Sequence, residues 1–263
     1  SFSIVNAKTV IRTDESAIGE ADPAKFSDNI DSIIMFNTYD ALVDELKNGA
    51  GLAPHLASGW EYADSTTLNV TLKDGIKFHS GNTLDADDVV FTIQMLLDDS
   101  TGSLNYAGAM QQWIKSVKKQ NKRTIVFNLK KANARFQLDY FSVKIWGGVT
   151  IMPEHIWKGK DPYTFAFYDK SKGWPIGTGA YKLSTASETE FIYDRDDNWW
   201  GAKSGWMSLP EPEQLMWVVT NTEETRSMLM TKANLDSIMD ITLGAFEAIK
   251  ARNRNVQAWW DDM

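Results

Sequence analysis

Two short motifs place a serine beside groups that could activate it as a nucleophile. Ser116-Val117-Lys118-Lys119 contains a Ser-x-x-Lys spacing, and Ser27-Asp28-Asn29 is a Ser-Asp-Asn triplet. Together they resemble two motifs of the serine β-lactamases. Those enzymes need the motifs in the opposite chain order and a Lys-Thr-Gly triplet after them, which this sequence lacks. The serines therefore do not form the set of groups that acyl transfer requires.

Residues that could bind a metal or a cofactor are also scarce. The chain has no cysteine, and its three histidines, His55, His79 and His155, have no histidine four residues away. Neither a thiolate site nor a paired-imidazole site is therefore visible. Gly177-Thr178-Gly179 begins like a dinucleotide fingerprint, but Lys182 stands where the third glycine belongs and a strand pattern follows instead of a helix. We predict no cofactor and no metal.

The eleven tryptophans are the side chains best suited to binding a ligand. An indole ring offers a flat, rigid surface on which a sugar ring or a peptide side chain can stack, and its N–H can donate to a hydroxyl. Trp146 and the adjacent pair Trp259 and Trp260 are the candidates, since neighbouring residues on a strand face opposite sides and one of the pair can face a ligand. We assign packing roles to Trp60, Trp113, Trp157, Trp199, Trp200 and Trp217.

A hairpin and a capped helix are the clearest elements that could position such groups. Apolar residues alternate with polar ones over residues 68–72, which predicts a strand. Asp74-Gly75 is a favoured turn, so Ile76 and Phe78 are expected to begin the returning strand. Asp85 can cap a helix, with acidic residues in its first turn. The helix has one apolar face, formed by Val89, Ile93, Leu96 and Leu97.

Strand and helix patterns continue along the rest of the chain, which predicts an α/β protein. Residues 1–43 are expected to form a strand and then a helix that starts at Ser27. Asn221 with Glu224 resembles a capping box, and we expect further elements at Leu243–Arg252, a helix, and Val256–Trp260, a strand. Other strands are expected around Ile125, Phe127, Leu129, Tyr181, Leu183, Phe191, Tyr193 and residues 215–219.

Composition limits the classes of partner. The net charge of −8 argues against a nucleic-acid partner, whose phosphates are bound by clustered Lys and Arg. The one basic cluster, between Lys115 and Lys131, is expected to be the solvated rim of a hairpin. No run of about 18 apolar residues could span a membrane, and residues 1–4 lack the features of a signal peptide. If the protein is exported, we expect this to be its mature form.

The order of several motifs resembles the family 5 extracytoplasmic solute-binding proteins of ABC importers. The longest match is the run from Lys73 to Thr92, and the others follow in the family's order. They are Ala21-Asp22-Pro23, Ile33–Val43, Leu56–Glu61, Met152–Trp157, Ile176–Leu183, Asn198–Gly201 and Met228–Asp236. Ala180 stands in place of a usual proline, and Asn234 where glycine is common. The resemblance also implies hydrogen-bonded loop roles for His79 and His155.

The resemblance implies a two-lobed periplasmic binding protein fold of type II, similar to cluster C. Residues 1–43 and 146–239 would form the first lobe, and residues 44–145 a peripheral subdomain rich in hairpins. Residues 240–263 would be only the start of the second lobe. An isolated chain of this length is then expected to expose apolar surface, to bind the C-terminal remainder of the same protein, and to have no affinity for the ligand by itself.

A family 5 protein captures a ligand and does no chemistry on it. The resemblance implies a small-molecule ligand, an oligosaccharide or oligopeptide, delivered to the transmembrane subunits of an ABC permease. The alternatives are a nickel or other small-ligand binder and, outside this class, a secreted hydrolase. The lack of a cysteine to carry a lipid favours a free periplasmic protein. The expected ligand-binding residues face the space between the lobes: Glu15, Ser16, Phe36, Asn37, Trp146, Trp259 and Trp260.

Overall fold

The computed structural model describes residues 9–15, 37–46, 51–142, 148–238 and 241–258. The chain divides into two compact units. The first comprises residues 1–19, 183–195 and 210–263, and the second comprises residues 20–182 and 196–209. The helix predicted from Ser27 lies outside the described residues. The predicted lobe boundaries stay a prediction.

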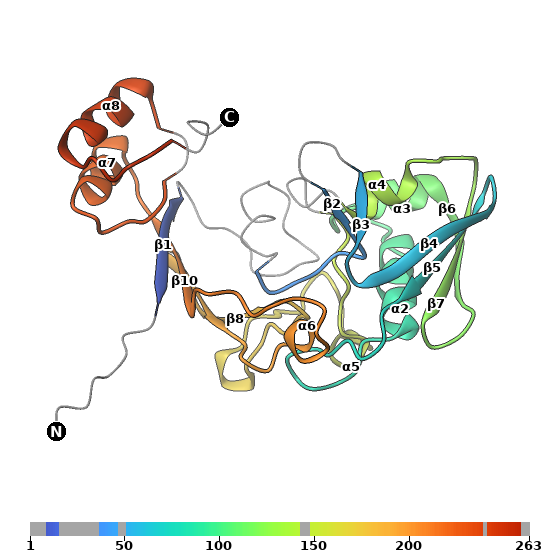
Figure 1. Ribbon diagram of the computed structural model, residues 1–263. Coiled ribbons are helices and arrows are strands. Elements are labelled where there is room, and N and C mark those ends of the chain that lie inside the picture. The colour runs from blue at the N-terminus through green and yellow to red at the C-terminus, as the bar shows by residue number, and fades with distance from the viewer. Residues whose placement is uncertain (1–8, 16–36, 47–50, 143–147, 239–240, 259–263) are drawn as a thin grey trace. The chain divides into compact units, whose positions relative to one another are not determined.

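The first unit is built on a sheet with the strand order β1-β10-β9-β8 (Figure 1). These strands are β1 (Val10–Glu15), β8 (Tyr181–Ala186), β9 (Glu190–Arg195) and β10 (Gln214–Val219). β10 pairs in parallel with β1 and antiparallel with β9. The carboxyl ends of β1 and β10 therefore lie at the same edge of the sheet, where ligands bind in many α/β proteins. The strand predicted within residues 1–43 and the three strands predicted between residues 181 and 219 are all confirmed.

Two helices, α7 (Glu223–Thr231) and α8 (Leu243–Arg252), complete the described part of this unit. The bounds of α8 match the prediction. The predicted cap of α7, Asn221, is wrong by one residue. The cap is Thr222, which is in the extended conformation and whose side chain accepts from Thr225 N. The predicted strand after α8 is also wrong over its described part, because residues 256–258 do not have strand conformation and Val256 N donates to Asn253 O at 3.2 Å.

The second unit contains an antiparallel sheet with the order β4-β5-β7-β6. Its strands are β4 (Ala57–Asp64), β5 (Thr67–Leu72), β6 (Ile114–Lys119) and β7 (Thr124–Leu129). Every second side chain of β5 and β7 is buried, because α2 (Ala86–Leu97) packs against this sheet, as Figure 1 shows. Shorter elements are β2 (Val43–Glu45), β3 (Leu52–Pro54), α3 (Ala107–Trp113), α4 (Phe136–Phe141), α5 (Glu154–Trp157), the 3-10 helix Lys170–Lys172 and α6 (Trp200–Lys203).

The predicted hairpin at Asp74-Gly75 is wrong in its second strand. β5 pairs with β4 on one side and with β7 on the other, so neither of its edges is open to a returning strand. Ile76 and Phe78 are instead buried in a loop that closes on itself, with a bridge between Lys77 and Thr83. The basic cluster does lie on an exposed rim, that of the β6–β7 hairpin, as predicted.

The predicted cap of α2 is confirmed and does more than begin the helix. Asp85 accepts from Asp87 N, and the carboxylate of Asp88 accepts from Asp85 N at 2.9 Å and, through its other oxygen, from Glu154 N at 2.9 Å. One buried side chain thus joins the first turns of α2 and α5. Because the charged carboxylate is buried, the pKa of Asp88 is raised to about 6.

Candidate functional site

The structure describes two of the seven predicted ligand-binding residues. Glu15 is the last residue of β1, and its backbone is paired with Val219 of β10. Asn37 is half-buried in a turn that leads into Thr38. The other five lie outside the described residues: Ser16, Phe36, Trp146, Trp259 and Trp260. The predicted set is therefore not tested as a whole, and the site is built from what supports Asn37 and Glu15.

The turn at Asn37 is held against the segment 177–181 by main-chain hydrogen bonds. Gly179 N donates to Thr38 O at 2.9 Å, and Tyr181 N donates to Asn37 O at 3.2 Å. The hydroxyl of Thr38 donates back to Tyr181 O at 3.1 Å. Three hydrogen bonds therefore set the position of Asn37 relative to the start of β8.

Two glycines allow this close approach. A Cβ atom at Gly177 would lie 2.1 Å from Thr38 O, and one at Gly179 would lie 2.6 Å from Asn37 O. Both distances are far below van der Waals contact and both neighbours are backbone atoms, so no side chain fits at either position. The Gly-Thr-Gly motif thus serves backbone packing, and the strand β8 follows it as the sequence predicted.

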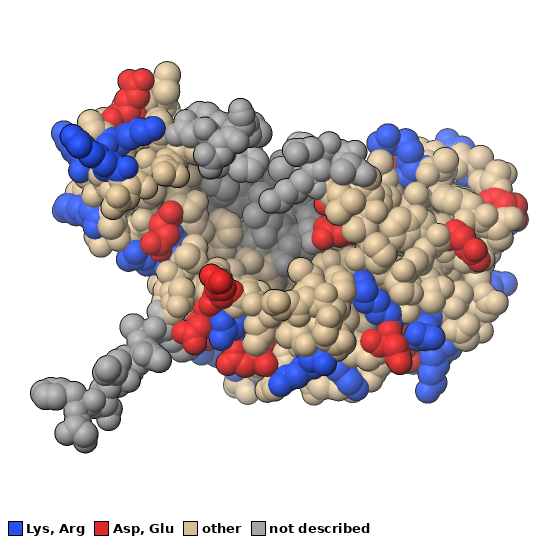
Figure 2. All heavy atoms as spheres, viewed as in Figure 1, with Lys and Arg blue, Asp and Glu red and all other residues tan. Residues whose placement is uncertain are grey.

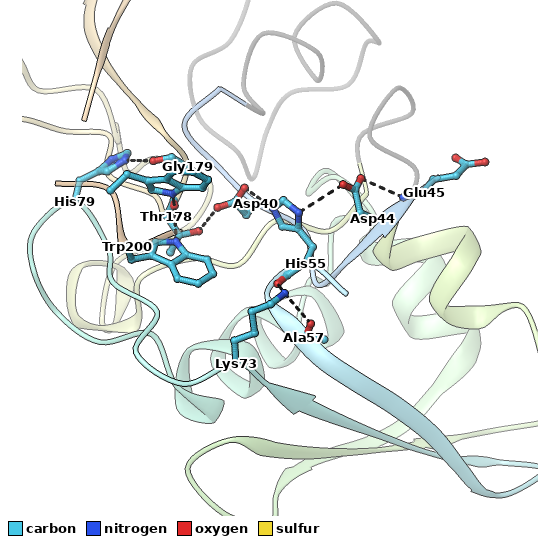
Figure 3. Close-up of polar contacts among 11 residues, drawn as sticks. Asp40, Asp44, Glu45, His55, Ala57, Lys73, His79, Thr178, Gly179 and Trp200 are labelled. Carbon is cyan, nitrogen blue, oxygen red and sulfur yellow. Dashed lines mark hydrogen bonds and ion pairs between the residues drawn. The ribbon is translucent and has the colours of Figure 1, made fainter. Parts of the chain in front are cut away.

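A buried aspartate joins the same two segments through side chains (Figure 3). Asp40 is only 7% exposed. Its Oδ2 accepts from the hydroxyl of Thr178 at 2.7 Å, and its Oδ1 lies 2.7 Å from Nε2 of His55. Nδ1 of His55 is 3.7 Å from Asp44 Oδ2, which is too long for a hydrogen bond. We call Asp40, His55 and Thr178 the Asp40 cluster; both carboxylate oxygens in it are engaged.

Tryptophans surround the Asp40 cluster. The indole N–H groups of Trp199 and Trp200 both donate to Thr178 O at 2.8 Å, and the ring of Trp206 stacks on Trp200 with centroids 5.0 Å apart. Lys73 Nζ lies 4.1 Å from the centroid of Trp206 and donates to the backbone carbonyl of His55. Burial lowers the pKa of Lys73 to about 8, although the charges of Asp40 and Asp44 act to raise it. The packing roles predicted for Trp199 and Trp200 are confirmed.

His79 has the loop role that the sequence indicated. Its Nδ1 accepts from Gly177 N at 3.3 Å, and its Nε2 lies 2.8 Å from Gly179 O, to which it donates. Burial is the main cause that lowers the pKa of His79. His155 lies in α5, where its Nε2 is 3.4 Å from the hydroxyl of Ser80. His79 thus ties the Gly-Thr-Gly motif to the loop before α2.

A second buried aspartate lies in the first unit, one residue before Glu15. Asp14 is 1% exposed, and its Oδ2 accepts from the hydroxyl of Thr220 at 2.6 Å and lies 3.0 Å from Nε of Arg226. No described residue donates a hydrogen bond to its Oδ1. We call Asp14, Thr220 and Arg226 the Asp14 cluster. It anchors the carboxyl end of β1, where Glu15 is the last residue of the strand.

The described residues show no grouped metal ligands, and the face seen in Figure 2 has charges of both signs. Among the described residues, no group of three or more His, Cys, Asp or Glu side chains is arranged to hold a metal ion. In Figure 2 the described Lys and Arg residues of the visible face are interspersed with Asp and Glu, with no extended basic surface. Within the described ranges, no helix is both long and apolar enough to cross a membrane.

Comparison with known proteins gives the family. The model of the middle part of the bacterial extracellular solute-binding proteins, family 5, matches residues 51–259. The chain belongs to this family. Among curated relatives, protein XP55 of Streptomyces lividans is 28% identical over 174 residues, which are 66% of this chain and 28% of that protein. The oligopeptide-binding protein AppA of Bacillus subtilis is 30% identical over 125 residues, 47% of this chain and 22% of AppA.

Solved structures place this family 5 chain in the two-lobed periplasmic binding protein fold. The structure of Bacillus subtilis AppA with a nonapeptide aligns with a TM-score of 0.79 at 18% identity, over 93% of this chain and 46% of AppA. That of a Thermotoga maritima oligopeptide-binding protein with mannohexaose aligns with a TM-score of 0.75 at 19% identity, over 98% and 46%. The chain thus spans less than half the length of these relatives. The relatives are substrate-binding transport proteins and not enzymes.

Sequence reasoning missed both aspartate clusters. The pattern around Asp40 shows an apolar helix or strand, and nothing in it marks His55 or Thr178 as its partners 15 and 138 residues away. One signal could have helped: two glycines flanking a threonine indicate a close backbone approach. The segment that approaches them is visible only in three dimensions.

Proposed function

We propose that this chain is the first part of the solute-binding component of an ABC importer, which captures an oligopeptide or an oligosaccharide between two lobes. The observation that carries the proposal is the family match over residues 51–259. Two relatives support an oligomeric ligand, since the solved AppA holds a nonapeptide and the Thermotoga protein holds mannohexaose. The tryptophan content suits either ligand, because indole rings stack on sugars and on peptide side chains.

In this proposal the ligand lies between a first lobe, residues 1–43 and 146–239, and a second lobe that begins at residues 240–263. Residues 44–145 form the peripheral subdomain. Glu15 lies at the shared carboxyl end of β1 and β10, and Asn37 is held by the Gly-Thr-Gly motif, so both have the rigid support that a binding residue needs. The proposed contacts are Glu15, Ser16, Phe36, Asn37, Trp146, Trp259 and Trp260.

The binding protein works with three kinds of partner. The C-terminal remainder of the same protein supplies the rest of the second lobe and part of the cleft. The transmembrane subunits of a permease receive the loaded, closed form outside the cytoplasm, and a separate ATPase drives transport. The family is extracellular by description, and we assign this member to the periplasm. Lobe closure over the ligand is the signal that the permease recognises.

Calorimetry on the full-length protein tests the proposal. We expect heat of binding with micromolar affinity or better from either a panel of two- to nine-residue peptides or a panel of oligosaccharides that includes mannohexaose. Trp146→Ala should weaken the binding that is found by about 1 to 3 kcal/mol if Trp146 stacks on the ligand. Trp113→Phe is the matched control, since Trp113 is half-buried in the peripheral subdomain and bonds Tyr140.

Two results would contradict parts of the proposal. Absence of binding from both panels would reject the oligomeric ligand. Equal affinity in Trp146→Ala and in the wild type would remove Trp146 from the ligand site while leaving solute capture intact. Heat from peptides alone would select the oligopeptide, and heat from oligosaccharides alone would select the sugar.

A further inference from the structure

We propose that Thr178 and Asp40 are positioning residues for solute binding, because they fix the turn that carries Asn37. This inference rests on the proposed function and deepens it. Neither residue is one of the proposed ligand contacts. Both are buried, at 2% and 7% exposure, so any effect they have on the ligand must pass through the segments that they join.

The first support is the charge balance around Asp40. A buried carboxylate is costly unless its oxygens are hydrogen-bonded or paired. Thr178 and His55 each engage one oxygen of Asp40, both at 2.7 Å. Loss of the Thr178 hydroxyl would remove this hydrogen bond between Asp40 and the segment 177–181, and the carboxylate would shift. Asp40 is three residues from Asn37, so its displacement moves the turn.

The second support is that Thr178 is itself fixed. Its carbonyl accepts two indole N–H groups, from Trp199 and Trp200. The glycines on either side pack on the backbone of residues 37 and 38 with no space for a side chain. Thr178 therefore has a fixed position, and the hydrogen bond from its hydroxyl fixes the carboxylate of Asp40 in turn. A ligand-binding residue needs this kind of support, because errors of about 0.5 Å weaken a site.

A second buried threonine provides the matched control. The hydroxyl of Thr92 in α2 donates to Asp88 O at 2.8 Å and accepts from Met152 N at 2.9 Å. It is 0% exposed and also lies in the second unit. It bonds the backbone of Asp88 and Met152, neither of which is a proposed ligand contact. Removing this hydroxyl should therefore reduce stability without changing the affinity for solute.

The experiment compares Thr178→Val, Thr178→Ser and Thr92→Val in the full-length protein. Valine keeps the shape of threonine and removes the hydroxyl, whereas serine keeps the hydroxyl. The probes are tri-alanine and mannohexaose, measured by calorimetry. We expect Thr178→Val to weaken binding roughly tenfold, as the loss of a hydrogen bond to a charged group would if it were felt at the ligand. Thr178→Ser should stay within about threefold of the wild type, and Thr92→Val should bind like the wild type.

Hydrogen exchange gives a reading that does not depend on the ligand. The amide of Tyr181 donates to Asn37 O, so it should exchange at least several-fold faster in Thr178→Val and at the wild-type rate in Thr92→Val. Asp40→Asn, which keeps the shape of the side chain, replaces Thr178→Val if the valine variant does not fold. It should weaken binding at least threefold.

The outcomes separate this inference from the proposed function. If the wild type binds a probe and Thr178→Val binds it equally well, the positioning role is wrong and solute capture stands. The same holds if Thr92→Val loses as much affinity as Thr178→Val, since the effect would then be general destabilisation. If the wild type binds neither probe nor any member of the two panels, the proposed function fails and this inference fails with it.

Discussion

In each of the two aspartate clusters, a buried carboxylate joins two segments that are far apart in the chain. Asp14 is the second-last residue of β1 in the first unit and Asp40 follows the Asn37 turn in the second. Both side chains are more than nine-tenths buried. Each accepts a short hydrogen bond from a threonine hydroxyl far away in the chain, Thr220 at 2.6 Å and Thr178 at 2.7 Å. Each thereby joins two segments that the proposed cleft requires.

The clusters differ in how their charge is balanced. Asp40 uses one oxygen for Thr178 and the other for an imidazole, His55. Oδ2 of Asp14 both accepts from the Thr220 hydroxyl and lies beside Arg226, whose guanidinium is always charged. No described residue donates to Oδ1 of Asp14. The comparison suggests that Asp40 depends on complete hydrogen bonding, whereas Asp14 depends on the nearby positive charge.

The largest effect is expected from Arg226→Met. This change leaves the Asp14 carboxylate buried without its cation, which should cost about 3 to 5 kcal/mol of the free energy of unfolding. Urea unfolding of the wild type and the variant measures the loss. Arg12→Met is the control: Arg12 pairs with Asp236 at 2.9 Å, but both side chains are about one-third exposed, so the loss should be about 1 kcal/mol. Equal losses would mean that Asp14 does not need a buried cation.

A smaller but still substantial effect is expected from Gly177→Ala. The new methyl group would meet Thr38 O at 2.1 Å, which must force the two segments of the Asp40 cluster apart. We expect a loss of about 1 to 3 kcal/mol in urea unfolding. Gly108→Ala in α3 is the control, since nothing lies within 4 Å of its Cβ position, and alanine there should be neutral or stabilising. A tolerated Gly177→Ala would show that the backbone contact is not needed.

Asp88 shows what happens to a buried carboxylate bonded only by backbone N–H groups. Its pKa is raised to about 6 by burial, from an ordinary value of 3.8. The folded state therefore favours the protonated form, and this contribution to stability is complete below pH 4 and lost as the pH rises to about 6. We expect the free energy of unfolding of Asp88→Asn, relative to the wild type, to rise by about 1 to 3 kcal/mol between pH 4 and 7.

Denaturant titrations at several pH values measure this difference. The asparagine is uncharged from pH 4 to pH 7, as the protonated carboxyl is, so it mimics the charge of the acid form over the whole range. A constant difference between the two proteins from pH 4 to pH 7 would mean that Asp88 titrates at an ordinary pKa.

The smallest effect is expected from Asp44→Asn. Asp44 lies 3.7 Å from the imidazole of His55 and its side chain is 40% exposed. Pairs of this kind contribute about 0 to 1 kcal/mol, so the free energy of unfolding should change by less than about 1 kcal/mol. Chemical denaturation again provides the value. A loss above that range would make Asp44, and not Asp40, the main partner of His55.

The sequence by itself was sufficient to predict the helices and strands whose signals are local. Asp85 and the apolar face that follows it predict α2, and alternating residues predict β5 and β7. The order of motifs also identified the family, because a long series of short matches specifies a fold better than any one of them. These signals depend on backbone preferences and on the periodicity of burial, which act over a few residues.

Pairings between distant segments were decided only in three dimensions. Ile76 and Phe78 have the pattern of a returning strand, but β4 and β7 already occupy both edges of β5. The residues around Asp40 do not indicate which donor it bonds. Thr178 reaches Asp40 because the glycines on either side of Thr178 pack closely on the Asn37 turn. The physical reason is that a hydrogen bond between remote residues depends on the packing of everything between them, and the amino-acid order alone does not encode that packing locally.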